Sequence, residues 1–124
     1  MKINDAIAKC DSIYPNTIDN EEKIDLLSRL DGSVKAEIFD KYESNDGEGF
    51  SGYAEDTSED TVLLVPFPFD NIYVSWLVAQ IYLLMDEHNK YNDWLLIFNS
   101  EWDNYERYYA QTHTQKAPNS FVYF

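Results

Sequence analysis

The spacing of apolar residues predicts four helical segments along the chain. In each segment apolar residues recur at intervals of three and four, as on one face of an α-helix. The segments are 3–13, 20–42, 70–87 and 91–111. The first ends at Tyr14-Pro15, because the residue before a proline avoids the helical conformation. The second starts with Asp19 and Glu22 in a capping-box pattern, and the glycine of Asp31-Gly32 allows a bend within it.

The last two segments share an apolar seam that runs from Leu77 to Tyr109 in steps of four and three. A single helix over 70–111 would be about 60 Å long, which is unusual for a small domain. The polar interval Asp86–Lys90 interrupts the seam, and Asn89 belongs to a residue type that commonly ends helices. We therefore favour two antiparallel helices, 70–87 and 91–111, while the pattern leaves both arrangements open.

Residues 43–69 carry no helical pattern and are expected to form an acidic loop followed by an extended strap. The part from 43 to 60 holds seven acidic residues, no basic ones and three of the four glycines. Phe50 and Tyr53 are the expected anchors of this loop, and the apolar run 62–65 is either a short strand or a buried extended segment. Residues 112–124 form a C-terminal tail. The fold class is therefore mainly α: one domain over 1–124, a small helical bundle with a long acidic loop and an extended tail.

Charge and composition narrow the classes of function. The 16% aromatic content indicates a folded chain. The formal net charge of −14 disfavours sequence-specific nucleic-acid binding and binding to anionic membranes. The apolar stretch 72–85 is too short to cross a bilayer, and the N-terminus has no secretory pattern. The single Cys10 fits a reducing compartment.

The chain carries none of the common catalytic motifs. It has no Gly-rich phosphate loop, HExxH, GxSxG or CxxC sequence. Gly49-Phe50-Ser51-Gly52 lacks the spacing of a nucleophile elbow, and nothing in the spacing of Cys10, His88 and His113 joins them in a catalytic pair. The acidic loop lacks the ligand spacing of an EF-hand. We therefore expect no enzymatic activity, no cofactor and no metal site.

The chain has more apolar surface than one small domain normally buries, which predicts contact with other chains. The segment 72–85 is apolar on nearly every face, and such a helix is expected to be buried all round. Four consecutive residues of high strand preference near the C-terminus also need a cover, for example the edge of a neighbouring copy. The candidate interaction residues are Trp76, Trp94, Trp102, Phe121, Val122, Tyr123 and Phe124.

The order of short sequence features resembles small proteins from the structural-gene cluster of tailed phages and prophages of Gram-positive bacteria, in particular head–tail connector (adaptor) proteins. The resemblance rests on Tyr14-Pro15-Asn16, Phe50-Ser51-Gly52-Tyr53, the run Leu64–Asp70, the run Trp76–Ile81 and the run Tyr108–His113. It implies a non-enzymatic virion protein, assembled in the bacterial host cytoplasm. Such a protein forms a homo-oligomeric ring between the portal and the tail or neck proteins.

Two other classes of function remain open at this stage. The first is an acidic inhibitor that mimics DNA and blocks a nucleic-acid-binding protein, which the charge supports and the apolar excess does not. The second is a calcium-dependent binding module. An acidic ring channel would also suit the connector, because DNA would pass without adhering to it.

Overall fold

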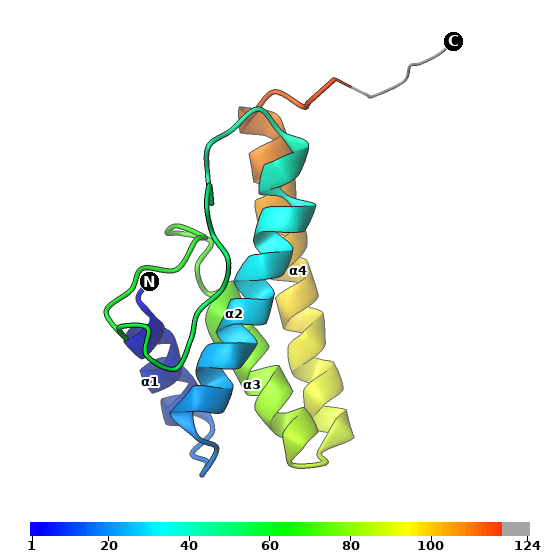
Figure 1. Cartoon of the computed structure of the whole chain (residues 1–124). Helices are drawn as coiled ribbons and strands as arrows, with labels where there is room; N and C mark the ends of the chain where they lie inside the picture. The colour runs from blue at the N-terminus through cyan, green and yellow to red at the C-terminus, as the bar shows by residue number, and fades with distance from the viewer. Residues whose placement is uncertain (118–124) are drawn as a thin grey trace.

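The structure is a computed structural model that describes residues 1–117, and it contains four α-helices in a bundle (Figure 1). They are α1 (Ile3–Ile13), α2 (Asn20–Glu37), α3 (Ile72–Leu84) and α4 (His88–Thr112), with a short 3-10 helix, η1 (Phe39–Lys41), after α2. The described residues form two isolated antiparallel bridges and contain no β-strand. The expected class, a mainly helical bundle, is confirmed. The tail residues from Pro118 to Phe124 lie outside the described part.

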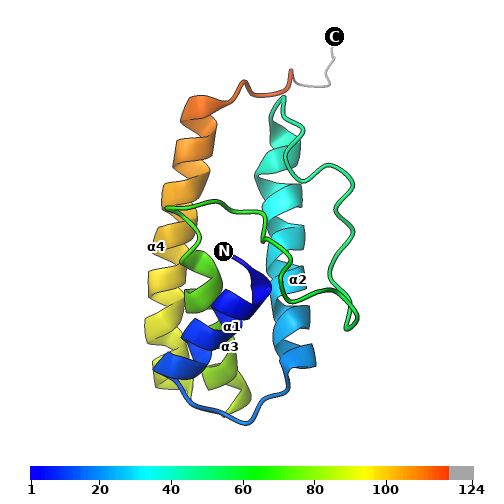
Figure 2. The same ribbon diagram turned by 90° about the vertical axis from the view of Figure 1, so that its left-hand side faces the viewer.

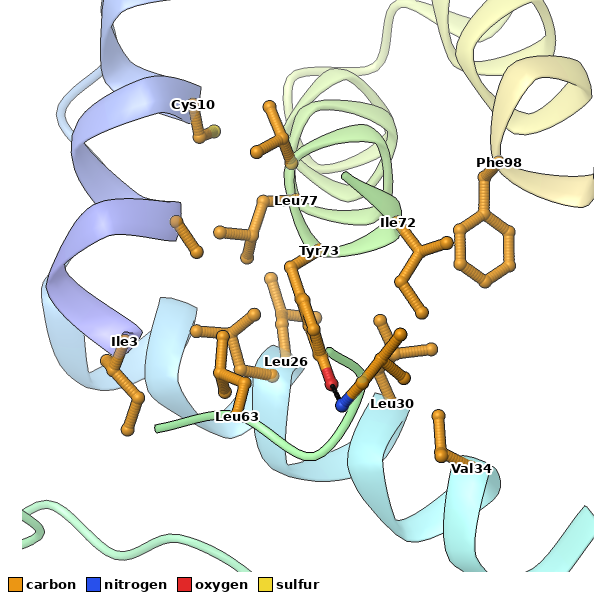
Figure 3. Close-up of a cluster of buried hydrophobic side chains, with 14 of the residues drawn as sticks. Ile3, Cys10, Leu26, Leu30, Val34, Leu63, Ile72, Tyr73, Leu77 and Phe98 are labelled. Atoms are coloured by element: carbon orange, nitrogen blue, oxygen red, sulfur yellow. Dashed lines mark hydrogen bonds between the residues drawn. The ribbon is translucent and has the colours of Figure 1, made fainter. Parts of the chain in front are cut away.

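Helix α3 is the centre of the bundle, because α1, α2 and α4 all pack against it. In Figure 3, Cys10 of α1 lies on the side of α3 toward which Leu77 points, and Phe98 of α4 lies beside Ile72 on the other side. Leu26 of α2 belongs to the same buried cluster. This arrangement covers α3 on almost every side from Ile72 to Ile81. From Ile72 to Ile81 the apolar side chains of α3 are therefore covered within the chain, so the inference of a partner chain does not depend on this part of the helix.

The strap that follows the acidic loop closes the N-terminal end of α1. The N–H groups of Ile3 and Asn4 donate to the carbonyl oxygens of Thr61 and Glu59 at 3.0 and 2.9 Å. The first N–H groups of a helix have no partner inside the helix, so these bonds satisfy two of them. Leu63 and Val65 are buried in the core behind this contact. The run 62–65 is thus an extended buried segment with one bridge, between Lys2 and Val62.

Helix α2 is continuous through Gly32, so the division into two short helices that this glycine allowed does not occur. Gly32 lies on the exposed face, while its neighbours Leu30 and Val34 are buried and hold this turn against the core. The expected side-chain cap by Asp19 does not form either. The C-terminal part of the predicted segment 20–42 tightens into η1, where the buried Phe39 anchors the turn.

Helices α3 and α4 form the antiparallel hairpin, which confirms two helices over one long helix (Figure 2). The turn lies earlier than expected: α3 ends at Leu84, and the predicted helix-ending residue Asn89 is inside the first turn of α4. Asp86 makes the turn by adopting φ = 60°, a left-handed conformation that Asp tolerates better than most residues. The polar interval Asp86–Lys90 therefore contains both the connection between the helices and the exposed first residues of α4. Polarity alone could not show where the connection ends and α4 begins.

The acidic loop is fastened to α2 at Tyr53, one of its two expected aromatic anchors. Tyr53 packs partly against the core, and its ring lies 5.0 Å from that of Phe50 in an edge contact. The Tyr53 N–H donates to Ser28 Oγ at 2.9 Å. A Cβ atom on Gly52, whose φ is 113°, would come within 2.9 Å of the same hydroxyl. The close approach of loop and helix at this point therefore requires glycine.

Candidate interaction site

An aromatic groove lies between α2 and α4, which meet only through α3. Within the described helices no Cα atom of α2 comes within 8 Å of one in α4. The space between them is a groove of about 610 Å³, within the range of sites that hold ligands or peptide side chains. We call it the α2–α4 groove. It is lined by Arg29, Leu30, Ser33, Glu37, Trp76, Phe98, Asn99 and Trp102.

The aromatic floor of the α2–α4 groove is held in a fixed orientation. The indole N–H of Trp76 donates to the backbone oxygen of Leu26 at 3.0 Å. The Trp76 ring lies 5.1 Å from that of Phe98, which in turn lies 6.0 Å from Trp102. Tilted rings at these separations attract one another, so the groove is preformed and offers aromatic faces to an apolar side chain.

The rim of the groove is polar and carries both signs of charge. Arg29 at one end pairs with the exposed Asp25, Nε to Oδ2 at 2.8 Å. Glu37 stands at the other end, at the C-terminus of α2, with Ser33 between them. An apolar floor with a polar rim is typical of sites that bind a peptide segment.

The structure brings together two of the three tryptophans singled out from the sequence. Trp76 and Trp102 line the α2–α4 groove from different helices. Trp94 lies two turns before Trp102 on α4 and packs partly against the core. The other candidates, Phe121, Val122, Tyr123 and Phe124, lie outside the described residues. The groove itself was not predicted, since it depends on the separation of α2 from α4 rather than on any local pattern.

A second apolar surface occurs on the α3–α4 hairpin. Its members are large apolar side chains that the bundle leaves exposed, and we refer to them as the hairpin surface: Leu83, Leu84, Met85, Leu96 and Ile97. Leu96 has 70% of its surface exposed. Single exposed apolar residues are ordinary, whereas a contact with another chain would take all five of these side chains out of water.

The main buried polar cluster is centred on Asp31, which is completely buried in α2. Its carboxylate accepts hydrogen bonds from the hydroxyls of Tyr73 at 2.6 Å and Tyr53 at 2.5 Å, and from the N–H of Leu64 at 3.1 Å. Burial raises the pKa of Asp31, and the three hydrogen bonds oppose that rise. Because the donors come from α3, the loop and the strap, the cluster joins three parts of the fold.

The sequence contained one sign of this cluster. Asp31 occupies a position that continues the apolar stripe of Leu27 and Val34 at helical spacing, so a carboxylate there had to be buried with partners. An ion pair with one buried partner was also not predicted from the sequence. Lys23, only 2% exposed, places its Nζ 2.7 Å from Asp11 Oδ1 and ties α2 to α1. No local pattern indicates that pair, because the partners are brought together by the packing of two helices.

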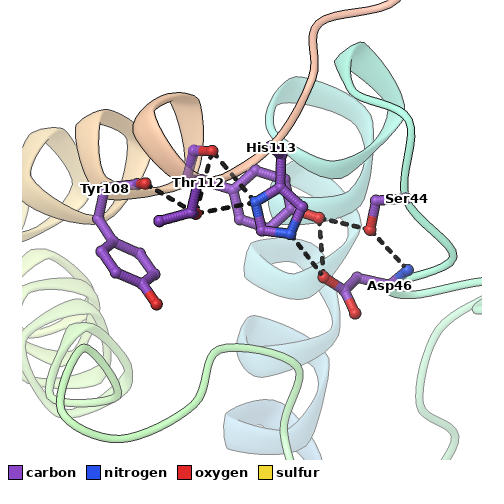
Figure 4. A network of polar contacts seen from close by, with 6 residues as sticks. Ser44, Asp46, Tyr108, Thr112 and His113 are labelled. Carbon is purple, nitrogen blue, oxygen red and sulfur yellow. Dashed lines mark hydrogen bonds and ion pairs between the residues drawn. The ribbon is translucent and has the colours of Figure 1, made fainter.

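A third polar cluster closes the end of the bundle where α4 stops (Figure 4). The ring of His113 stacks on that of Tyr109 at 3.7 Å, and its Nε2 lies 3.7 Å from Asp46 Oδ2. The Tyr109 hydroxyl donates to Asp46 Oδ2 at 2.8 Å and accepts from the Ser44 hydroxyl at 2.7 Å. The serine hydroxyl thus contacts Tyr109 rather than the imidazole, and the cluster fastens the start of the acidic loop to α4.

The other candidate groups for nucleophilic chemistry are not brought together. Cys10 is buried in the core, and burial raises the pKa of its thiol to about 12, which keeps it protonated at neutral pH. His88 pairs with Asp86 at the exposed first turn of α4, at the opposite end of that helix from His113. Gly49-Phe50-Ser51-Gly52 lies in the irregular loop. Among residues 1–117, no group of three or more His, Cys, Asp or Glu side chains is placed to hold a metal ion.

Comparison of the chain with known protein families, curated proteins and solved structures gave no match. In the described part of the chain, no helix has both the length and the apolar character that a membrane crossing requires.

Proposed function

We propose that this protein is a non-enzymatic subunit of a multi-chain assembly, specifically a head–tail connector in which copies form a ring between the portal and the tail or neck proteins of a virion. The observation that carries the proposal is the hairpin surface. Its five large apolar residues remain exposed although the rest of α3 is covered within the chain. Contact with other chains would remove this surface from water, which is favourable in proportion to the apolar area buried.

The connector is the specific form of this proposal, and it comes from the sequence resemblance described above. The acidic character of the chain agrees with a channel that passes DNA. All seven carboxylates of the loop between residues 43 and 60 are exposed, and a negative surface does not hold a phosphate backbone. Self-repulsion at −14 would also keep isolated copies apart until salt or a template opposes it.

The proposal is tested by light scattering coupled to size-exclusion chromatography. The 14.5 kDa chain should show a higher molar mass as salt is raised from 0.05 to about 1 M, where the Debye length falls to about 3 Å, or when portal and neck proteins are added. The double variant Leu84→Ser/Leu96→Ser should remain monomeric. Val62→Ser, an apolar-to-polar change at an exposed strap residue, is the matched control and should assemble like the parent chain.

A parent chain that stays at 14.5 kDa beside its virion neighbours would contradict the connector proposal. The exposed loop carboxylates favour one alternative, an acidic mimic of DNA. That function would appear as displacement of duplex DNA from a DNA-binding enzyme by this protein at stoichiometric concentration. A variant with Glu55, Asp56, Glu59 and Asp60 changed to their amides should then lose the displacement.

A further inference from the structure

We infer that copies of this chain join head to tail, with Phe67 of one copy inserted into the α2–α4 groove of the next, against Trp76, Phe98 and Trp102. The inference rests on the proposed function in one respect, namely that copies of this chain meet. It adds which surfaces meet. One half of the contact is the turn of residues 66–69, which we call the Phe67 turn, and the other half is the groove.

Phe67 is the most exposed large apolar residue in the described part of the chain, at 83%. The residues on either side of it are held in place. Val65 is buried and its N–H donates to the Tyr73 hydroxyl at 2.6 Å, and Phe69 packs partly against the core. The N–H of Phe69 donates to the carbonyl oxygen of Pro66 at 2.9 Å, which closes the turn around Phe67. A ring presented on a fixed turn loses little freedom on binding, so it suits the role of an interface anchor.

The Phe67 turn and the groove lie on different sides of the bundle. On α4, Asn104 lies beside the turn, whereas Asn99 lines the groove, and these positions are about 140° apart around the helix. On α2, Asp31 accepts a hydrogen bond from the strap, whereas Ser33, about 200° away, lines the groove. Figure 2 shows the strap crossing the face of the bundle that carries α1. The groove that receives Phe67 therefore belongs to a second copy.

This placement produces a contact that repeats from copy to copy. When a surface patch fits a pocket elsewhere on the same molecule, copies join head to tail. The array closes into a ring if the rotation between copies permits it, and otherwise continues as a filament. A two-fold dimer instead uses the same patch on both partners. The ring of the proposed function requires the head-to-tail kind of contact, and the Phe67 turn and the groove supply its two halves.

The groove matches an inserted phenyl ring in its chemistry. Its floor offers the rings of Trp76, Phe98 and Trp102, and aromatic rings attract one another in tilted contacts. Arg29 at the rim, with 72% of its side chain exposed, can lie over the inserted ring, because a guanidinium is attracted to an aromatic face. Strap residues 61–69 contain no charged side chain. This part of the chain therefore approaches another acidic copy with little charge repulsion.

The groove is also continuous with the hairpin surface. Leu96, which is 70% exposed, lies three positions before Asn99 of the groove, and residues at this spacing are neighbours on the surface of a helix. A copy that fills the groove would therefore also approach Leu96 and remove it from water, which is favourable. One interface would then cover both the groove and this part of the hairpin surface.

Fluorine nuclear magnetic resonance of full chains that carry 5-fluorotryptophan tests the inference at the groove itself. The labelled chain carries Phe67→Ser, so its groove is intact and it has no ring to insert. The unlabelled partner carries Ser33→Arg, which blocks its own groove and leaves Phe67 free. In about 1 M NaCl, where the Debye length is about 3 Å, the partner should shift the signals of Trp76 and Trp102. The signal of Trp94, which does not line the groove, should shift less.

A second unlabelled partner isolates the contribution of Phe67. The double variant Phe67→Ser/Ser33→Arg keeps the hairpin surface and differs from the first partner at one residue. It should require at least about tenfold more protein for the same shift, as expected for the loss of an interface anchor. Val62→Ser/Ser33→Arg, changed at another exposed strap residue, is the matched control and should act like the first partner. Thermal unfolding checks that every variant folds.

The outcomes separate this inference from the proposed function. Equal shifts with and without Phe67 would overturn the inference and assign the groove to another part of the second copy. No shift, although light scattering shows that the parent chains assemble, would overturn it and leave the proposed function standing. A shift that requires Phe67, in a parent chain that does not join portal and neck proteins, would support the head-to-tail contact and contradict the connector. Chains that neither assemble nor shift the signals would overturn both.

Discussion

The hydroxyl of Tyr73 lies between Asp31 and the strap, donating to the carboxylate at 2.6 Å while it accepts the N–H of Val65 at 2.6 Å. One side chain from α3 therefore fixes both α2 and the extended strap, and Figure 3 shows its hydrogen bond to the strap. Tyr53 completes the arrangement from the acidic loop. A loop of this length is held in place by a few specific contacts, so its stability should depend on them individually.

We expect Tyr53→Phe to lower the free energy of unfolding by about 1–2 kcal/mol, because it removes one hydrogen bond to a buried carboxylate. Chemical denaturation would measure this change. Hydrogen exchange should also become faster in the loop 43–60, while the amides of α3 and α4 follow only the global change. Tyr108→Phe, at an exposed side chain, is the control and should leave stability within about 0.5 kcal/mol. An equal loss in both variants would contradict a special role for Tyr53.

The pH dependence of stability should carry the signature of Asp31. Burial holds its pKa above the ordinary value of 3.8 in the folded chain. The folded state then binds more protons than the unfolded state between the two values, so stability falls as pH rises through that window. The parent chain should therefore exceed the Asp31→Asn variant in free energy of unfolding by the largest amount below pH 3.8. This difference should decrease above that pH. Denaturant midpoints over a pH series test this, and a difference that grows with pH would show that the three hydrogen bonds outweigh burial.

Replacing Lys23 and replacing Asp11 should lower the free energy of unfolding by different amounts. Lys23 is buried, whereas Asp11 is 39% exposed and can be solvated alone. Asp11→Asn leaves a buried cation without its counter-ion and should cost about 2–3 kcal/mol, while Lys23→Met removes the buried charge and should cost less than about 1 kcal/mol. Equal costs, measured by denaturation at neutral pH, would show that the pair is solvated as a whole.

Calcium should leave the melting temperature nearly unchanged. The acidic loop has no ligand spacing, and its carboxylates are exposed rather than directed at one point. A ligand that binds only the folded chain stabilises it by RT ln(1 + [L]/Kd). Scanning calorimetry at 5 mM CaCl₂, with MgCl₂ at equal ionic strength as the control, should give equal midpoints. A rise of several degrees with calcium alone would reveal a specific site.

The helical segments could be predicted from sequence because their periodicity is local. The C-terminal end of α1 followed from Pro15. The existence of the hairpin followed from the polar interval Asp86–Lys90. The position of the turn depended on Asp86 adopting a left-handed conformation, which composition does not reveal. The continuity of α2 depended on burial of Leu30 and Val34 on either side of Gly32, a tertiary effect that outweighs the low helix propensity of glycine.

The candidate site was predictable only in part, for the same physical reason. Trp76 and Trp102 stood out as large aromatic residues on two helices that carry more apolar surface than one small domain normally covers. Their convergence across the α2–α4 groove required knowledge of how α3 separates those helices. Asp31 stood on an apolar stripe, yet its donors come from 22 and 42 positions away, a separation that no local spacing rule covers.

The central position of α3 also has a consequence for synthesis of the chain on the ribosome. Helices α1 and α2 emerge first, but the surface that buries their apolar faces does not exist until residue 84 has been added. At about 5–20 residues per second, those faces stay uncovered for several seconds in every nascent chain. A fragment of residues 1–71 should accordingly bind hydrophobic dyes and unfold without a cooperative transition. The N-terminal half should therefore be prone to association during synthesis until α3 packs against both of its helices.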